Sequence, residues 1–107
     1  MKMAKKQISS KKAPDKLSVE AQGIWTDVAA GWQLDSAAFV LLGIGLEAFD
    51  EMRQAQSILT ADGPIVRDRF GVPKQHPACL VLRDSRNAAL KCFRQLSLDI
   101  ESILRKD

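Results

Sequence analysis

The chain has 107 residues, 46% of them apolar and 27% charged, a composition that fits one small globular domain. Only two cysteines are present, and the longest apolar run, residues 37–46, is about half the length that a bilayer of roughly 30 Å requires. These features argue against a disulfide scaffold and a membrane protein, and we expect reduced thiols in a cytoplasmic compartment. Few aromatic residues and no tyrosine disfavour base stacking on exposed rings.

The first 16 residues are rich in lysine and carry few large apolar groups. Such a segment cannot bury enough surface to offset the entropy lost on ordering. We therefore expect residues 1–16 to form a disordered basic tail and residues 17–107 to form one helical domain. The tail contributes four candidate DNA-binding residues: Lys5, Lys6, Lys11 and Lys12.

The domain is predicted to begin with a helix over residues 19–31. Apolar residues recur at steps of three and four from Ala21 to Trp32, which places them along one side of a helix. Ser18 is well placed as the N-cap, and Leu17 precedes it as a hydrophobic staple.

A second helix is predicted over residues 36–60, capped by Asp35 and Ser36 and stopped by Gly63 and Pro64. One side carries a continuous apolar line, and Val40 and Ile44 lie on the opposite side. A helix that is apolar on every side must be buried on every side. We therefore expect Val40 and Ile44 to lie in an interface between copies of the chain.

The connection over residues 60–76 is too long for a tight turn between helices. Its alternating Val66, Asp68 and Phe70 favour a small hairpin around Arg67 and Asp68, although its glycines and prolines favour simple turns as well.

A third helix is predicted over residues 77–97, because Pro77 suits the first helical position and His76 then serves as its cap. A short helix over residues 99–106 completes an all-α, oligomer-forming fold of three main helices and one short one.

Charge is segregated along the chain. Residues 17–66 hold seven acidic side chains against Arg53 alone, whereas residues 67–94 hold seven basic side chains against Asp68 and Asp84. A positive surface of this kind suits a polyanion, although solvated charges that happen to sort this way are the simpler interpretation. The candidate DNA-binding residues of this second block are Arg67, Arg69, Lys74, Arg83, Arg86, Lys91 and Arg94.

No enzyme or cofactor is expected. The chain lacks the G-x-S-x-G, P-loop and H-E-x-x-H motifs. Cys79 and Cys92 lie about 20 Å apart along one predicted helix at 1.5 Å per residue, too far to share a metal ion. A catalytic histidine needs an orienting carboxylate and a nucleophile, and no catalytic motif accompanies His76. A structural role, or at most a polar contact to a partner, is therefore expected for His76, and no catalytic or metal-binding residue is named.

Several residues occur in an order that identifies a resemblance. They are Trp25 in the first helix, the helix opening Asp35-Ser36-Ala37-Ala38-Phe39, the Gly63 turn, a Gly-x-x-x-x-His-Pro element from Gly71 to Pro77, and the helix end Leu96-Ser97-Leu98. This order resembles the short terminase small subunits of tailed phages over roughly residues 20–105. The His-Pro opening of the last long helix is the most specific of these features.

The resemblance implies a noncatalytic partner of the large terminase subunit, the motor and nuclease that cuts viral DNA and packs it into a procapsid. It implies binding of double-stranded DNA at the packaging site, assembly into a homo-oligomeric ring, and a cytoplasmic location in a bacterial host.

Two alternatives stay open. One is a small helix-turn-helix regulator, although the residues that open the second helix offer few groups to read bases. The other is a helical adaptor that binds only protein.

Overall fold

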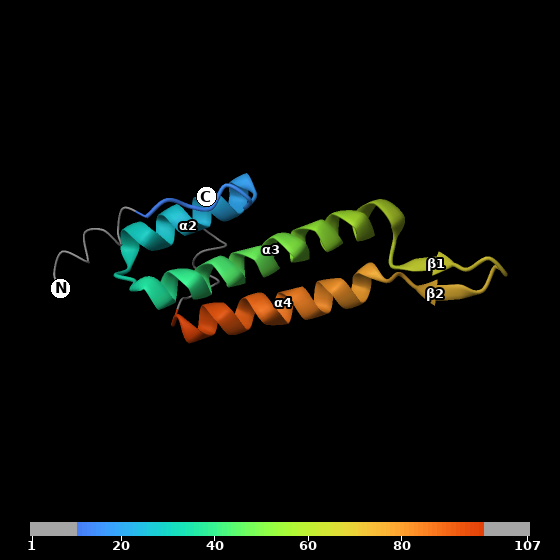
Figure 1. Ribbon diagram of the computed structural model, residues 1–107. Coiled ribbons are helices and arrows are strands. Elements are labelled where there is room, and N and C mark those ends of the chain that lie inside the picture. The colour runs from blue at the N-terminus through green and yellow to red at the C-terminus, as the bar shows by residue number, and fades with distance from the viewer. Residues whose placement is uncertain (1–10, 98–107) are drawn as a thin grey trace.

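The computed structural model describes residues 11–97, and these residues are mostly helical. In chain order they form α2 (Val19–Gly31), α3 (Ser36–Asp62), β1 (Ile65–Arg67), β2 (Pro73–Gln75) and α4 (Ala78–Gln95). Helices α3 and α4 lie antiparallel and side by side, α2 packs beside the first half of α3, and the two strands project beyond the far end of the helix pair (Figure 1).

The caps of α2 and α3 are those expected from the sequence. The Ser18 hydroxyl accepts a hydrogen bond from the Ala21 N–H at 3.0 Å, and the Asp35 carboxylate accepts one from the Ala38 N–H at 2.8 Å. Helix α3 continues two residues beyond the predicted end, to Asp62. Gly63 then closes it with a φ of 81°, a left-handed conformation that glycine adopts without strain.

Helix α4 is shorter than predicted at both ends. Pro77 is its N-cap rather than its first residue, and the helix ends at Gln95 rather than residue 97. Ser97 has a φ of 61°, which turns the backbone out of the helical path. The short helix expected over residues 99–106 lies outside the described residues.

The connection between α3 and α4 is the small hairpin that the alternation suggested. Strand β1 pairs antiparallel with β2, with Val66 opposite Lys74. The turn between them is closed by the carboxylate of Asp68, which accepts hydrogen bonds from the N–H groups of Phe70 at 2.8 Å and Val72 at 3.0 Å.

The core joins all three helices. The Trp25 and Phe39 rings meet with their centroids 5.2 Å apart, and Phe49 and Phe93 are almost fully buried. The predicted stripe of the first helix is buried as far as Ala29. The prediction was wrong for Trp32, which stands just past the end of α2 and is 41% exposed.

Residues 11–16, which were expected to be disordered, contact the helices. The Trp25 indole N–H donates to the carbonyl of Lys11 at 3.2 Å, Ala13 packs against the core, and Lys16 pairs with Glu47. This backbone acceptor satisfies the one polar atom of a buried tryptophan. The ordered domain therefore begins before residue 17.

Helices α3 and α4 approach closely at Gly45. A Cβ atom on this glycine would lie 2.9 Å from the Cβ of Cys92 and 3.1 Å from the Phe93 ring. A side chain at position 45 would therefore force the two helices apart.

Candidate nucleic-acid and subunit interfaces

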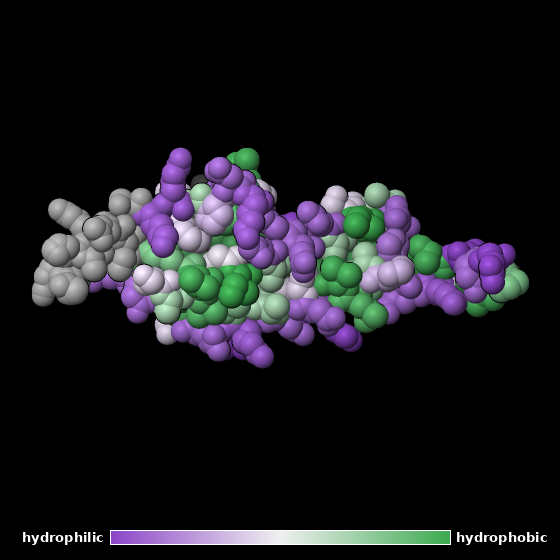
Figure 2. All heavy atoms as spheres, viewed as in Figure 1, coloured by the Kyte–Doolittle hydropathy of each residue, from purple (hydrophilic) through white to green (hydrophobic). Residues whose placement is uncertain are grey.

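The outer side of α4 carries four of the predicted DNA-binding residues. Arg83, Arg86, Lys91 and Arg94 are all exposed, whereas Ser85, Ala89, Cys92 and Phe93 of the same helix are buried. From Arg83 to Arg94 the row spans about 16 Å at 1.5 Å per residue. Hydrophilic side chains border this side of the molecule (Figure 2).

These four cations differ in their partners. The Arg83 Nε donates to the Asp84 carboxylate at 3.1 Å. Among the described residues, no ion pair involves Arg86, Lys91 or Arg94. Within residues 11–97, no acidic side chain therefore pairs with the positive charge of these three residues.

The hairpin holds the other three predicted cations of this block, and each has a local contact. Arg67 donates to the Gly71 carbonyl at 2.8 Å, Arg69 lies over the Phe70 ring at 5.1 Å, and Lys74 is 3.9 Å from Asp68. The hairpin extends beyond the helices, so these residues do not share a patch with Arg94 at the other end of α4 (Figure 1).

The lysines of the N-terminal segment divide between described and undescribed residues. Lys5 and Lys6 lie outside the described residues. Lys11 and Lys12 are exposed, and the Lys11 ammonium lies 5.6 Å from the centroid of the Phe39 ring. Lys11 therefore lies beside α2 and the start of α3, away from the hairpin.

Within the acidic block, residues 17–66, acidic side chains form contacts between α2 and α3. Arg53 of α3 binds the Glu20 carboxylate of α2 through two nitrogens, at 3.0 and 3.1 Å, and its guanidinium stacks 5.0 Å from the Phe49 ring. The Asp50 carboxylate accepts hydrogen bonds from both the backbone N–H and the hydroxyl of Ser18, at 2.8 and 2.5 Å. These acidic residues fasten α2 to α3.

His76 links the end of α3 to the start of α4. Its Nδ1 accepts a hydrogen bond from the Ala78 N–H at 3.0 Å, and its Nε2 lies 2.9 Å from the carboxylate of Asp62, the last residue of α3. An acceptor at Nδ1 places the proton on Nε2, which then donates to Asp62. The N-cap position is Pro77 rather than His76 as predicted, but the His76 ring still accepts from the first N–H of α4. The bond to Asp62 is an additional link that spacing alone did not show.

Val40 and Ile44, the predicted interface residues, project from the first half of α3. They are 63% and 53% exposed, which is high for β-branched apolar side chains in the middle of a helix. Apolar side chains gather in separate patches over the helices and near the hairpin in Figure 2. A second exposed apolar region contains Ile58 of α3 and Val81 of α4, and the sequence had not indicated it.

The described residues contain no group of three His, Cys, Asp or Glu side chains that could hold a metal ion. None of the helices in residues 11–97 is both long and apolar enough to cross a bilayer. Comparisons of the chain with models of protein families, with curated proteins and with solved structures gave no match.

Proposed function

We propose that this protein is the noncatalytic small subunit of a phage DNA-packaging terminase. In this role it binds double-stranded viral DNA at the packaging site, assembles as a homo-oligomeric ring in the cytoplasm of a bacterial host, and regulates the motor and nuclease of the large subunit. The observation that carries the proposal is the row of exposed cations on α4, of which Arg86, Lys91 and Arg94 take part in no ion pair among the described residues.

The contrast with the other cations supports a nucleic-acid partner. Lys16, just before the acidic block, and Arg53, within it, are matched by Glu47 and Glu20 of that block. The α4 row instead presents charge to solvent along a straight helix face, an arrangement that suits the regularly spaced phosphates of a duplex. The exposed Val40 and Ile44 support self-assembly, and the His76–Pro77 opening of α4 supports the family resemblance.

The DNA test compares the chain with a variant that carries Arg83→Ala and Arg86→Ala. Fluorescence anisotropy with a labelled duplex across a salt series gives the affinity and its salt slope. We expect weaker binding to every duplex sequence and a salt slope shallower by about 0.9 for each lost phosphate contact. Lys16→Ala is the matched control, because this lysine pairs with Glu47 on another part of the surface.

Unchanged affinity and slope in the double variant would remove this face of α4 from the DNA interface. The companion measurement is absolute mass by light scattering after size exclusion at two concentrations. A closed assembly larger than a tetramer, with the same mass at both concentrations, is the expected result, and a monomer would contradict the ring.

A helix-turn-helix regulator is the second candidate, and a feature of the fold speaks against it. The short connection between α2 and α3 leads into exposed Ser36, Ala37 and Val40, which offer one hydroxyl to read bases. A monomer or dimer that discriminates strongly between duplex sequences would favour the regulator. A chain that binds no DNA at low salt would favour the adaptor.

A further inference from the structure

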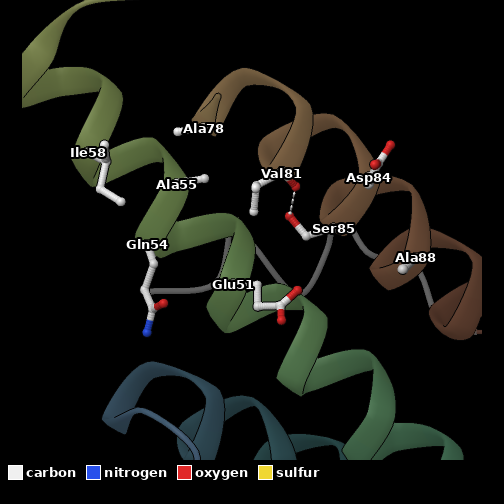
Figure 3. A pocket seen from close by; sticks show the side chains of 9 residues that line it. All are labelled: Glu51, Gln54, Ala55, Ile58, Ala78, Val81, Asp84, Ser85 and Ala88. Atoms are coloured by element: carbon white, nitrogen blue, oxygen red, sulfur yellow. Dashed lines mark hydrogen bonds between the residues drawn. The ribbon is translucent and has the colours of Figure 1, made fainter. Parts of the chain in front are cut away.

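A groove opens between α3 and α4 in the half of the helix pair nearest the hairpin (Figure 3). It is open to solvent, has a volume of about 590 Å³, and its small floor residues come from both helices: Ala55, Ala78, Ser85 and Ala88. Ile58 and Val81 flank the floor and are 45% and 47% exposed. Glu51, Gln54 and Asp84 complete the lining, so the only charged groups that line the groove are acidic.

Helix α2 does not cover this groove. Its first residues reach Asp50 and Arg53 of α3, and the chain then runs back along the first half of α3 (Figure 1). The second half of the helix pair therefore has two helices where the first half has three. An occupant that suits the vacant side must bring an apolar group for the floor and positive charge for Glu51 and Asp84.

The turn of the hairpin offers this combination. Phe70 stands at the tip and is 77% exposed, with Val72 beside it at 50%. Arg69 lies over the face of the Phe70 ring, and the Arg67 guanidinium donates to the carbonyl of Gly71, the next residue of the turn. An exposed aromatic ring beside arginines has the composition of an interface hot spot.

The tip is also held in one conformation. The Asp68 carboxylate accepts two backbone N–H bonds, the Gly71 N–H donates to the Asp68 carbonyl at 2.9 Å, and the Arg67 guanidinium donates to the Gly71 carbonyl. A turn fixed in this way loses little conformational entropy when it binds, which favours its use as an insertion element.

The tip of one chain lies far from the groove of the same chain. Strands β1 and β2 continue the long axis of the helix pair and point away from it (Figure 1), and their backbone pairing holds this direction. A tip that occupies a groove must therefore come from another copy.

We propose that the groove between α3 and α4 receives the hairpin tip of a second copy of this chain. Phe70 of the incoming tip lies over the alanine and serine floor between Ile58 and Val81, and its arginines face Glu51 and Asp84. Asp84 already accepts from Arg83, but both side chains are about two-thirds exposed, and an ion pair at such a site is weak enough to admit a second cation.

This contact rests on the self-assembly part of the proposed function and is independent of DNA. It assigns Arg67 and Arg69 to the contact between copies, which leaves the outer side of α4 as the DNA face. Because the donating and receiving surfaces are different parts of the molecule, repetition of the contact can close a ring.

The experiment measures absolute mass by light scattering over a dilution series without DNA, for the full chain and its variants. We expect Phe70→Ala and Glu51→Lys each to raise the concentration at which the assembly half-dissociates by about tenfold or more. The chain that carries both Glu51→Lys and Arg69→Glu restores the attraction with its sign reversed, and it should assemble better than the Glu51→Lys chain.

Two matched controls accompany these variants. Val19→Ala removes an apolar side chain that is 87% exposed on α2, and Asp15→Lys reverses an exposed acidic charge outside the groove. Both should assemble like the parent. Circular dichroism checks that each variant keeps its helices, and Phe70→Ala, which alters an exposed tip, keeps the test valid if Glu51→Lys fails to fold.

Helical Phe70→Ala and Glu51→Lys chains that assemble like the parent would overturn the proposed contact alone. A double variant no better than the Glu51→Lys chain would overturn the charge pairing that selects the tip as occupant. A parent chain that is monomeric at every concentration would overturn this contact together with the proposed ring.

Discussion

At the scale of single residues, two glycines two positions apart have different roles. Gly45 and Gly43 both lie within α3, where glycine is unfavourable compared with alanine. Only Gly45 meets α4 at distances too short for a side chain, whereas the nearest atom to a Cβ at position 43 is in the Trp25 ring at 3.8 Å. Gly45 therefore permits the close approach of α3 and α4, whereas position 43 has room for a side chain.

We therefore expect opposite effects from two matched substitutions. Gly45→Ala should lower the free energy of unfolding by roughly 1–3 kcal/mol, because Cys92 and Phe93 must move. Gly43→Ala should raise it by about 0.5–1 kcal/mol, because alanine restricts the unfolded chain and fits ordinary contact distances. Urea unfolding of both variants provides the measurement, and equal effects would contradict this packing.

Side-chain chemistry also explains what the residue pattern missed. Ser85 is buried, although a polar side chain predicts exposure. Its hydroxyl donates to the Val81 carbonyl at 2.6 Å and so needs no water. Phe70 is exposed, although an apolar side chain predicts burial. The turn closed by Asp68 holds the backbone of Phe70 away from the helices. Both outcomes depend on hydrogen bonds that periodicity does not describe.

At the scale of elements, the three helices were predictable because their apolar periodicity is long, and α2 and α3 begin at Ser18 and Asp35, which are preferred N-cap residues. The hairpin was less certain, since its strands have three residues each and its pairing depends on turn geometry. Residues 11–16 could not be placed from composition. Their order depends on the Lys11 carbonyl, a backbone acceptor that every sequence possesses and that matters here only because Trp25 lies beside it.

Asp50 accepts two of the hydrogen bonds that hold the start of α2 against α3. Asp50→Ala removes both acceptors of Ser18 and should cost about 1–3 kcal/mol. Hydrogen exchange should then be faster in α2 than in the parent chain, with the α4 amides unchanged. Gln54→Ala, one turn further along α3, is the matched control. Faster exchange spread equally over α2 and α4 would show that the helices open together rather than separately.

At the scale of the whole molecule, the apolar residues of α3 divide into a buried set and an exposed set. Leu46 and Phe49 are buried in the core, whereas Val40 and Ile44 are more than half exposed. Periodicity predicted this division. It did not predict where the candidate DNA-binding residues lie, and the described ones are found on three separate parts of the molecule: the N-terminal segment, the hairpin and α4. Only the fold shows this separation, because the sequence groups these residues by their charge and does not show how far apart they lie in space.

Charged substitutions in the two sets should act differently. Leu46→Asp or Phe49→Asp should unfold the chain, because a carboxylate would replace a fully buried apolar group. Val40→Asp and Ile44→Asp should leave the helical circular dichroism intact and reduce the assembled mass measured by light scattering. Fully assembled Val40→Asp and Ile44→Asp chains would remove this part of α3 from the subunit interface.

The close approach at Gly45 also gives the protein an internal chemical reporter. Cys92 is buried directly beneath Gly45, whereas Cys79 lies half-buried at the other end of α4. A thiol reagent can modify Cys79 with small local motion, but it reaches Cys92 only when α3 and α4 separate. The ratio of the two labelling rates therefore measures how often the helix pair opens in the native protein, with no substitution in the chain.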